Sequence, residues 1–113
     1  MPLNVRNRKI NEVAILDLSG KITLGESTGV LRDEIASLIA QGETKILVNM
    51  AGVSYVDSAG LGELLGAYTT AASHGASLKL LHLGGKMRDL LQITKLYTVF
   101  QTFDNESTAL SSY

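Results

Sequence analysis

The sequence predicts an α/β fold with a mixed, mostly parallel sheet of four to five strands and about four helices. Short apolar runs without helical period, such as residues 45–50 and 77–83, alternate with segments in which apolar residues recur every three or four positions, such as 28–40. Strands separated by helices require right-handed crossovers, which place successive strands parallel in one sheet. The length of 113 residues fits one domain, so we expect a single domain over residues 1–113.

The N-terminal part predicts a β-hairpin, which adds an antiparallel strand to the sheet. Residues 3–9 and 13–18 form two short runs, and the second is apolar at almost every position, which is typical of a strand buried on both faces. A loop over residues 20–27 follows. Ser27 is expected to cap the next helix.

Residues 28–40 predict an amphipathic helix that ends at Gly42. Three charged residues, Arg32, Asp33 and Glu34, lie mostly off its apolar stripe and are expected to form a solvated face. The stripe, with spacings i, i+4, i+7 and i+8, consists of Leu31, Ile35, Leu38 and Ile39.

The middle of the chain predicts a central strand and a second helix. Residues 45–50 form an apolar run without helical period, and a separate extended piece is expected at 54–56. The helix follows Ser58 and ends near His74 and Gly75. Its apolar face consists of Leu61, Leu64, Leu65, Tyr68 and Ala72.

The C-terminal part predicts two further strands and two helices. Residues 77–83 form a strand, Gly84 and Gly85 a turn, and residues 86–93 a helix. A last strand near 99–103 and a short helix from about residue 107 complete the chain. The inward positions of the first of these helices are Met87, Leu90 and Leu91.

Composition and charge exclude several classes of function. A formal net charge of −1, with both signs interspersed, provides no basic stripe, so no direct nucleic-acid partner is expected. The chain lacks the roughly 18 to 20 consecutive apolar residues of a membrane span and a signal peptide's apolar core, so we expect a cytoplasmic protein without a membrane span. The absence of cysteine removes disulfides, thiolate catalysis and zinc–thiolate sites.

The stretch most indicative of function is Asp57 to Gly62, which follows an apolar run and opens a helical segment. It places the Ser58 hydroxyl at a strand-to-helix turn, where unpaired backbone N–H groups and the positive end of the helix dipole favour a phosphate. Ser58 is therefore a candidate phosphorylation site. Serine is also a common helix cap, and the spacing alone favours that structural role.

The same stretch resembles a known family. Residues 53–62, Val-Ser-Tyr-Val-Asp-Ser-Ala-Gly-Leu-Gly, followed by Leu64, Leu65, Gly66 and Tyr68, are similar to the signature of the STAS domains of anti-sigma factor antagonists. The resemblance covers nearly the whole chain.

The resemblance implies a non-enzymatic binding module of a bacterial partner-switching pathway, without cofactor or metal. Unphosphorylated, the protein would bind an anti-sigma factor and free a sigma factor. The anti-sigma factor would also be a serine kinase that phosphorylates Ser58 with ATP, and a separate phosphatase would reset it. The implied partner-binding residues are Asp57, Ser58, Ala59, Gly60, Gly62, Thr23, Leu24 and Gly25.

The resemblance leaves the roles of Thr23 and Asp57 less defined than those of the other residues. Many relatives carry Asp where Thr23 stands, so a charged contact at this position is not carried over to this chain. Asp57 has two equally supported roles: its carboxylate caps the helix, or it orients Ser58 toward an incoming nucleotide phosphate.

The glycines and histidines suggest enzyme or cofactor sites only weakly. The spacing of Gly60, Gly62 and Gly66 differs by one residue from the dinucleotide-binding pattern, and no acidic residue follows at the required distance. These glycines are better explained by a close approach of the helix start to the sheet or to a partner. A serine hydrolase would need glycine where Val56 stands, and neither histidine of the chain is tied to Ser58 by spacing.

Two alternative functions stay open at this point. The domain could be a constitutive STAS interaction subunit of a transport or signalling complex that is never phosphorylated. Less well supported is a nucleotide-binding protein built at the Ser58 turn.

Overall fold

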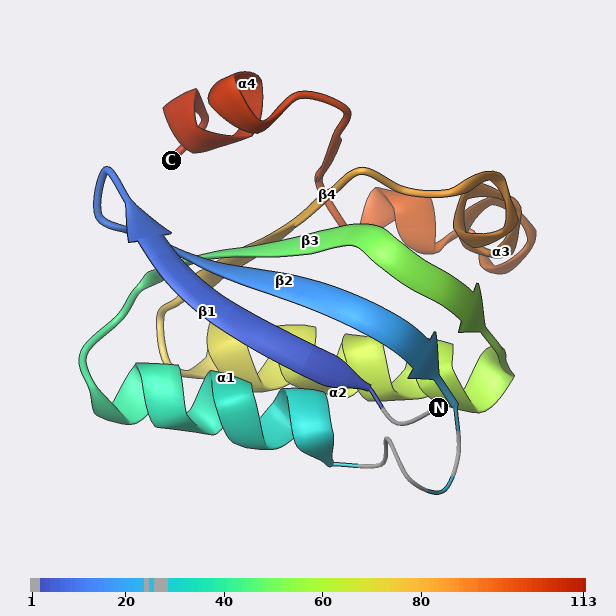
Figure 1. Cartoon of the computed structure of the whole chain (residues 1–113), viewed down its shortest axis with the longest axis horizontal. Helices are drawn as coiled ribbons and strands as arrows, with labels where there is room; N and C mark the ends of the chain where they lie inside the picture. The colour runs from blue at the N-terminus through green and yellow to red at the C-terminus, as the bar shows by residue number, and fades with distance from the viewer. Residues whose placement is uncertain (1–2, 24, 26–28) are drawn as a thin grey trace.

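A computed structural model describes residues 3–23, 25 and 29–113 and confirms the predicted α/β fold. Five strands form one sheet in the order β1-β2-β3-β4-β5, in which β1 is antiparallel to β2 and all other neighbours are parallel. Helices α1 and α2 lie side by side under one face, and α4 lies over the other (Figure 1). The elements are β1 (Asn4–Ile10), β2 (Val13–Ile22), α1 (Val30–Ala40), β3 (Lys45–Val56), α2 (Ser58–Ser73), β4 (Ser77–Leu81), α3 (Gly85–Thr94), a 3-10 turn (Leu96–Thr98), β5 (Thr102–Phe103) and α4 (Glu106–Ser111).

The N-terminal hairpin is present, with Ile10 paired to Val13 across a tight turn. The two turn residues, Asn11 and Glu12, both have positive φ values of 51° and 67°. Two such residues give the mirror-image turn whose twist matches that of the strands it joins.

The central strand β3 is a single strand of twelve residues, where the sequence had suggested two separate pieces. Strand β2 also continues beyond Gly20, which had been assigned to a loop, and its register shifts keep it paired with β3 as far as Ile22 opposite Val56. Gly52 permits this pairing, because a Cβ there would lie 2.6 Å from the Leu18 carbonyl oxygen. Glycine is thus needed at this position inside the strand.

The sheet buries a core on each face, as the apolar run in β2 predicts. Alternate residues divide between the cores: Leu16 joins the larger core against α1 and α2, and Ile15 joins the smaller core under α4. The buried face of α2 differs from the prediction, because Ala67 and Ala71 are buried and Ala72 is exposed.

Smaller differences occur at element ends. Helix α1 begins at Val30, and the expected cap Ser27 lies outside the described residues. The last strand is shorter than expected, because the Val99 and Phe100 amides donate to the Leu96 carbonyl oxygen of a 3-10 turn and only Thr102 and Phe103 pair with β4.

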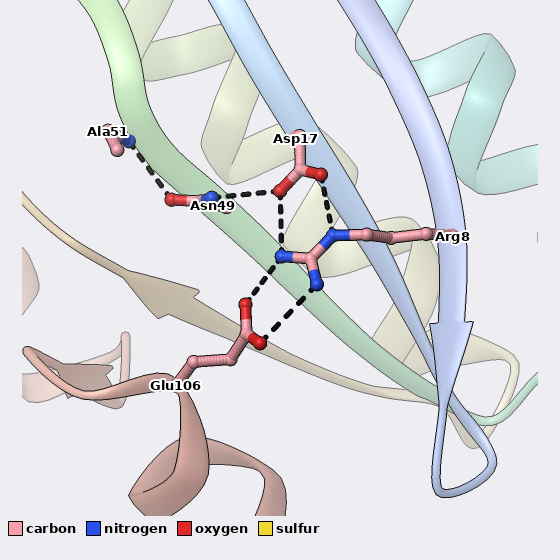
Figure 2. Close-up of polar contacts among 5 residues, drawn as sticks. All are labelled: Arg8, Asp17, Asn49, Ala51 and Glu106. Carbon is pink, nitrogen blue, oxygen red and sulfur yellow. Dashed lines mark hydrogen bonds and ion pairs between the residues drawn. The ribbon is translucent and has the colours of Figure 1, made fainter.

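Helix α4 is fastened to the sheet by a polar network around Arg8 (Figure 2). The guanidinium donates to Asp17 at 2.6 and 3.1 Å and to Glu106 at 2.5 and 3.3 Å. Asn49 donates to Asp17 at 2.8 Å. The hydrogen bonds from Arg8 lower the pKa of both carboxyls, Asp17 and Glu106. The network therefore links β1, β2 and β3 to the start of α4.

The other end of α4 is held by Lys79, a buried residue of β4. Its ammonium donates to the carbonyl oxygen and the hydroxyl of Ser112, both at 2.9 Å, and lies 4.3 Å from the centre of the Tyr113 ring. The Tyr113 hydroxyl in turn donates to the Ile46 carbonyl oxygen, and burial raises the pKa of this hydroxyl.

Replacing Arg8 with Ala should lower the free energy of unfolding by about 1 kcal/mol at neutral pH, because both ion pairs are about one-third exposed and screened by water. Lys9→Ala, which removes an exposed pair with Glu43, is the matched control and should cost less than about 0.5 kcal/mol. Urea denaturation measures both losses.

The Arg8→Ala difference should also depend on pH. Asp17 and Glu106 have ordinary pKa values of 3.8 and 4.5, which are lowered in the folded state, so their contribution is fully present above these values and is lost as the pH falls below them. A difference that persisted undiminished in acid would contradict the ionic nature of the network.

Candidate functional site

The Ser58 turn is formed where β3 ends and α2 begins. Asp57 is the N-cap of α2: its Oδ1 accepts from the Gly60 amide at 2.7 Å, and its carbonyl oxygen accepts from the Leu61 amide at 2.9 Å. Ser58 is the first residue of the helix, so the capping role that spacing had favoured for it belongs to Asp57.

The Ser58 side chain is exposed, and no hydrogen bond to its hydroxyl is found among the described residues. It lies at the positive end of a helix of sixteen residues. A negative group added to it would gain about 0.3 to 1 kcal/mol from the dipole and the unpaired amides. The Asp57 carboxylate next to it would oppose part of that gain.

Gly60 fixes how closely α2 approaches the sheet. A Cβ on Gly60 would lie 1.7 Å from the Ile22 carbonyl oxygen, which also accepts from the Asp57 amide at 3.4 Å. Gly62 differs, because it is exposed and a Cβ there would meet nothing within 4 Å. Gly60 therefore makes the predicted close approach to the sheet, whereas the approach of a partner at Gly62 stays a prediction. Ala59, between them and Ser58, is exposed.

The second predicted segment leaves the sheet beside this turn. Because Ile22 pairs with Val56, the next residues on each strand, Thr23 and Asp57, emerge at the same edge of the sheet. Figure 1 shows that the ends of β2 and β3 and the start of α2 lie together at this end of the sheet. Thr23 is half-buried and Gly25 is exposed with a φ of 103°, whereas Leu24 lies outside the described residues.

Glu63 is a buried carboxylate in the second turn of α2 that the sequence did not lead us to expect at the site. It accepts a hydrogen bond from the Gly29 amide at the start of α1 and lies 3.8 Å from the Arg32 guanidinium. Arg32 therefore does not belong to a purely solvated face. One signal was available, because Glu63 is the sole charged residue in the stretch 58–73.

Tyr55 and Lys86 form a further feature that the sequence analysis missed. The Tyr55 side chain at the end of β3 is 38% exposed, and the Lys86 ammonium lies 4.0 Å from the centre of its ring. Beside this pair is a hollow of about 200 Å³ between the end of β3 and the start of α3. An exposed aromatic residue near Ser58 thus adds apolar area to this edge of the molecule.

Neither histidine is recorded in contact with Ser58 in the described part of the chain. His74 ends α2, where its Nδ1 lies 2.9 Å from the Thr70 carbonyl oxygen, and His82 is exposed after β4. The described residues contain no cluster of acidic or histidine side chains placed to hold a metal ion. None of their helices combines the length and apolarity of a bilayer span.

Comparison with known proteins places this arrangement in a family of domains. The STAS domain model matches residues 4–109, and the chain belongs to the STAS domain family. The anti-sigma-B factor antagonist of Bacillus subtilis is 32% identical over 96 residues, which cover 85% of this chain and 86% of that protein.

Two solved structures share the fold. An anti-sigma factor antagonist from Mycobacterium paratuberculosis has a TM-score of 0.83 at 18% identity, over 97% of this chain and 92% of that one. The Bacillus cell fate determinant SpoIIAA in its phosphorylated form has a TM-score of 0.73 at 23% identity, over 96% of this chain and 98% of that one.

Gly60→Ala should destabilise the protein by about 2 kcal/mol or more, because the added methyl group clashes with backbone that cannot move without shifting α2. Gly62→Ala is the matched control, and the better helix propensity of alanine should stabilise the protein by roughly 0.5 kcal/mol. Thermal unfolding of both variants measures this, and equal effects would contradict the close approach at Gly60.

Asp57→Ala should cost about 1 kcal/mol of stability through loss of the cap, whereas Asp57→Asn should cost only a few tenths, because its amide oxygen still accepts from Gly60. Chemical denaturation tests the cap. The second role of Asp57, orienting Ser58 toward a nucleotide phosphate, is tested by comparing the rates at which Asp57→Asn and the unchanged chain are phosphorylated. Only that role requires the carboxylate charge, so it predicts a lower rate for Asp57→Asn.

Proposed function

We propose that this protein is an anti-sigma factor antagonist, which binds an anti-sigma factor while Ser58 is unmodified and is released when Ser58 is phosphorylated. The observation that carries the proposal is the exposed Ser58 hydroxyl at the first position of α2. The relative that is 32% identical bears the name of such an antagonist, and a protein of the same fold has been solved in a phosphorylated form. This role places the protein in the cytoplasm.

The docking face combines the Ser58 turn with the neighbouring segment that leaves β2. It consists of Asp57, Ser58, Ala59, Gly60, Gly62, Thr23, Leu24 and Gly25. Ala59, Gly62 and Gly25 are exposed and carry at most a methyl group, which leaves their backbone open to a partner's surface. Thr23 supplies a hydroxyl without charge.

In the modification step, the Ser58 oxygen attacks the γ-phosphorus of ATP held by the kinase. The new O–P bond forms as the bond to the β-phosphate oxygen breaks, ADP leaves, and the hydroxyl proton passes to a base of the kinase. This chain supplies the nucleophile, and Asp57 holds the helix start in place. A separate phosphatase hydrolyses the ester to restore the hydroxyl.

The phosphate acts on the partner and leaves the fold intact. A phosphoserine carries about −1.5 to −2 charges, and at the start of α2 the helix stabilises that charge. Beside the Asp57 carboxylate, the same charge repels an acidic surface and is costly to desolvate against an apolar one. A loss of about 3 kcal/mol, on the order of 10²-fold in affinity, is enough to separate a moderate complex.

The anti-sigma factor partner is sought as a small histidine-kinase-like ATPase from the same genome. Replacing Ser58 with Glu should weaken binding to this ATPase by on the order of 10²-fold, while Ser58→Ala should remain bound. Ser73→Glu adds the same charge at the far end of α2 and is the control. Isothermal titration measures the three affinities. A partner that binds Ser58→Glu as tightly as the unchanged protein would instead indicate a constitutive STAS subunit.

Modification in the cell is tested by intact-mass analysis of the protein from its native source, with peptide mapping. We expect a fraction that carries one phosphate on the peptide containing Ser58. A phosphate on another residue, or none under any growth condition, would contradict the proposal.

A further inference from the structure

The connection between β2 and α1 is held at both ends by the first two turns of α2. At one end, the Ile22 carbonyl oxygen accepts from the Asp57 amide at 3.4 Å and lies against Gly60. At the other end, the Gly29 amide donates to a side-chain oxygen of Glu63. Both ends are thus fixed to the helix that carries Ser58.

Glu63 accepts a hydrogen bond from the backbone amide of Gly29, the N-cap residue of α1. The residue before α1 is Gly29, which has a φ of 84° and no side chain to accept from the first amides. The Glu63 carboxylate reaches this position from the neighbouring helix, where the positive end of α1 favours its charge. One carboxylate therefore joins the starts of two helices.

The residues around Glu63 bury its side chain and leave space for the Arg32 guanidinium beside it. Only 9% of Glu63 is exposed, and its second oxygen lies 3.8 Å from the Arg32 guanidinium. Gly66 makes room for that guanidinium, because a Cβ there would lie 2.6 Å from its Nη2. Buried charges rarely stabilise a fold more than apolar side chains of similar size. What the carboxylate adds here is one acceptor at a fixed position.

We propose that Glu63 is a positioning residue of the docking face, which fixes Gly29 and the start of α1 against the helix that carries Ser58, so that Thr23 and Gly25 are restrained before the partner binds. This inference rests on the proposed function, because it assigns Glu63 a part in that same interaction. Thr23 and Gly25, the described members of this segment on the docking face, lie between the two fixed ends. Fixing both ends before binding reduces the conformational entropy that docking must otherwise remove.

The first test needs no partner. Glu63→Met removes the acceptor at nearly constant size, Glu63→Gln keeps a carbonyl acceptor without charge, and Arg32→Ala removes only the ion pair. Hydrogen exchange of the Gly29 amide should accelerate about tenfold or more in Glu63→Met and change less than about threefold in the other two variants. Amide resonances of Thr23 and Gly25 should move in Glu63→Met alone.

The second test measures binding of the unphosphorylated variants to the histidine-kinase-like ATPase. Glu63→Met should weaken binding about tenfold or more, and Glu63→Gln should restore it to within about threefold of the original affinity. Glu63→Ala serves if Glu63→Met does not fold. Melting temperatures confirm that each variant is folded at the temperature of the assay.

The outcomes separate this inference from the proposed function. If Glu63→Met leaves Gly29 exchange or partner affinity unchanged, Glu63 is not a positioning residue, although the Ser58 switch can still hold. If Glu63→Gln weakens binding as much as Glu63→Met, the effect comes from charge and the inference is also overturned. Absence of both kinase binding and Ser58 phosphate would remove the proposed function, and the docking role with it, whatever the exchange data show.

Discussion

The close contact between the start of α2 and the end of β2 is the constraint on which the rest of the site depends. Gly60 lies so near the Ile22 carbonyl oxygen that no side chain fits between them. This contact brings the first turn of α2 to the edge of the sheet, where Thr23 also leaves β2. Ser58 is displayed because the residue two positions after it is buried.

Neighbouring residues at the start of α2 have separate roles: some accept hydrogen bonds from backbone amides, and Ser58 is left exposed. Asp57 satisfies the Gly60 amide, so the serine that follows is not needed as a cap and its hydroxyl stays exposed. Glu63, one turn further on, satisfies the Gly29 amide of another helix. A helix start organised in this way can accept a negative charge without rearrangement, because its dipole and its unpaired amides favour that charge.

Local patterns in the sequence were sufficient to predict the hairpin, the helices and the strand-to-helix turn at Ser58. They failed where a distant segment decides the structure. The need for glycine at position 52 comes from the neighbouring strand β2, and Arg8 meets a partner 98 residues away in Glu106. Glu63 was missed for the same reason, since its acceptor role exists only once α1 lies against α2.

The central claim is that charge gained at Ser58 changes docking and leaves the fold as it is. The most direct test is a structure, by crystallography or NMR, of the chain phosphorylated at Ser58 compared with the unmodified chain. We expect α2 to begin at Ser58 in both, with the Asp57 cap and the Gly60–Ile22 contact retained. Unwinding of the first turn of α2, or displacement of the end of β2, would contradict the claim.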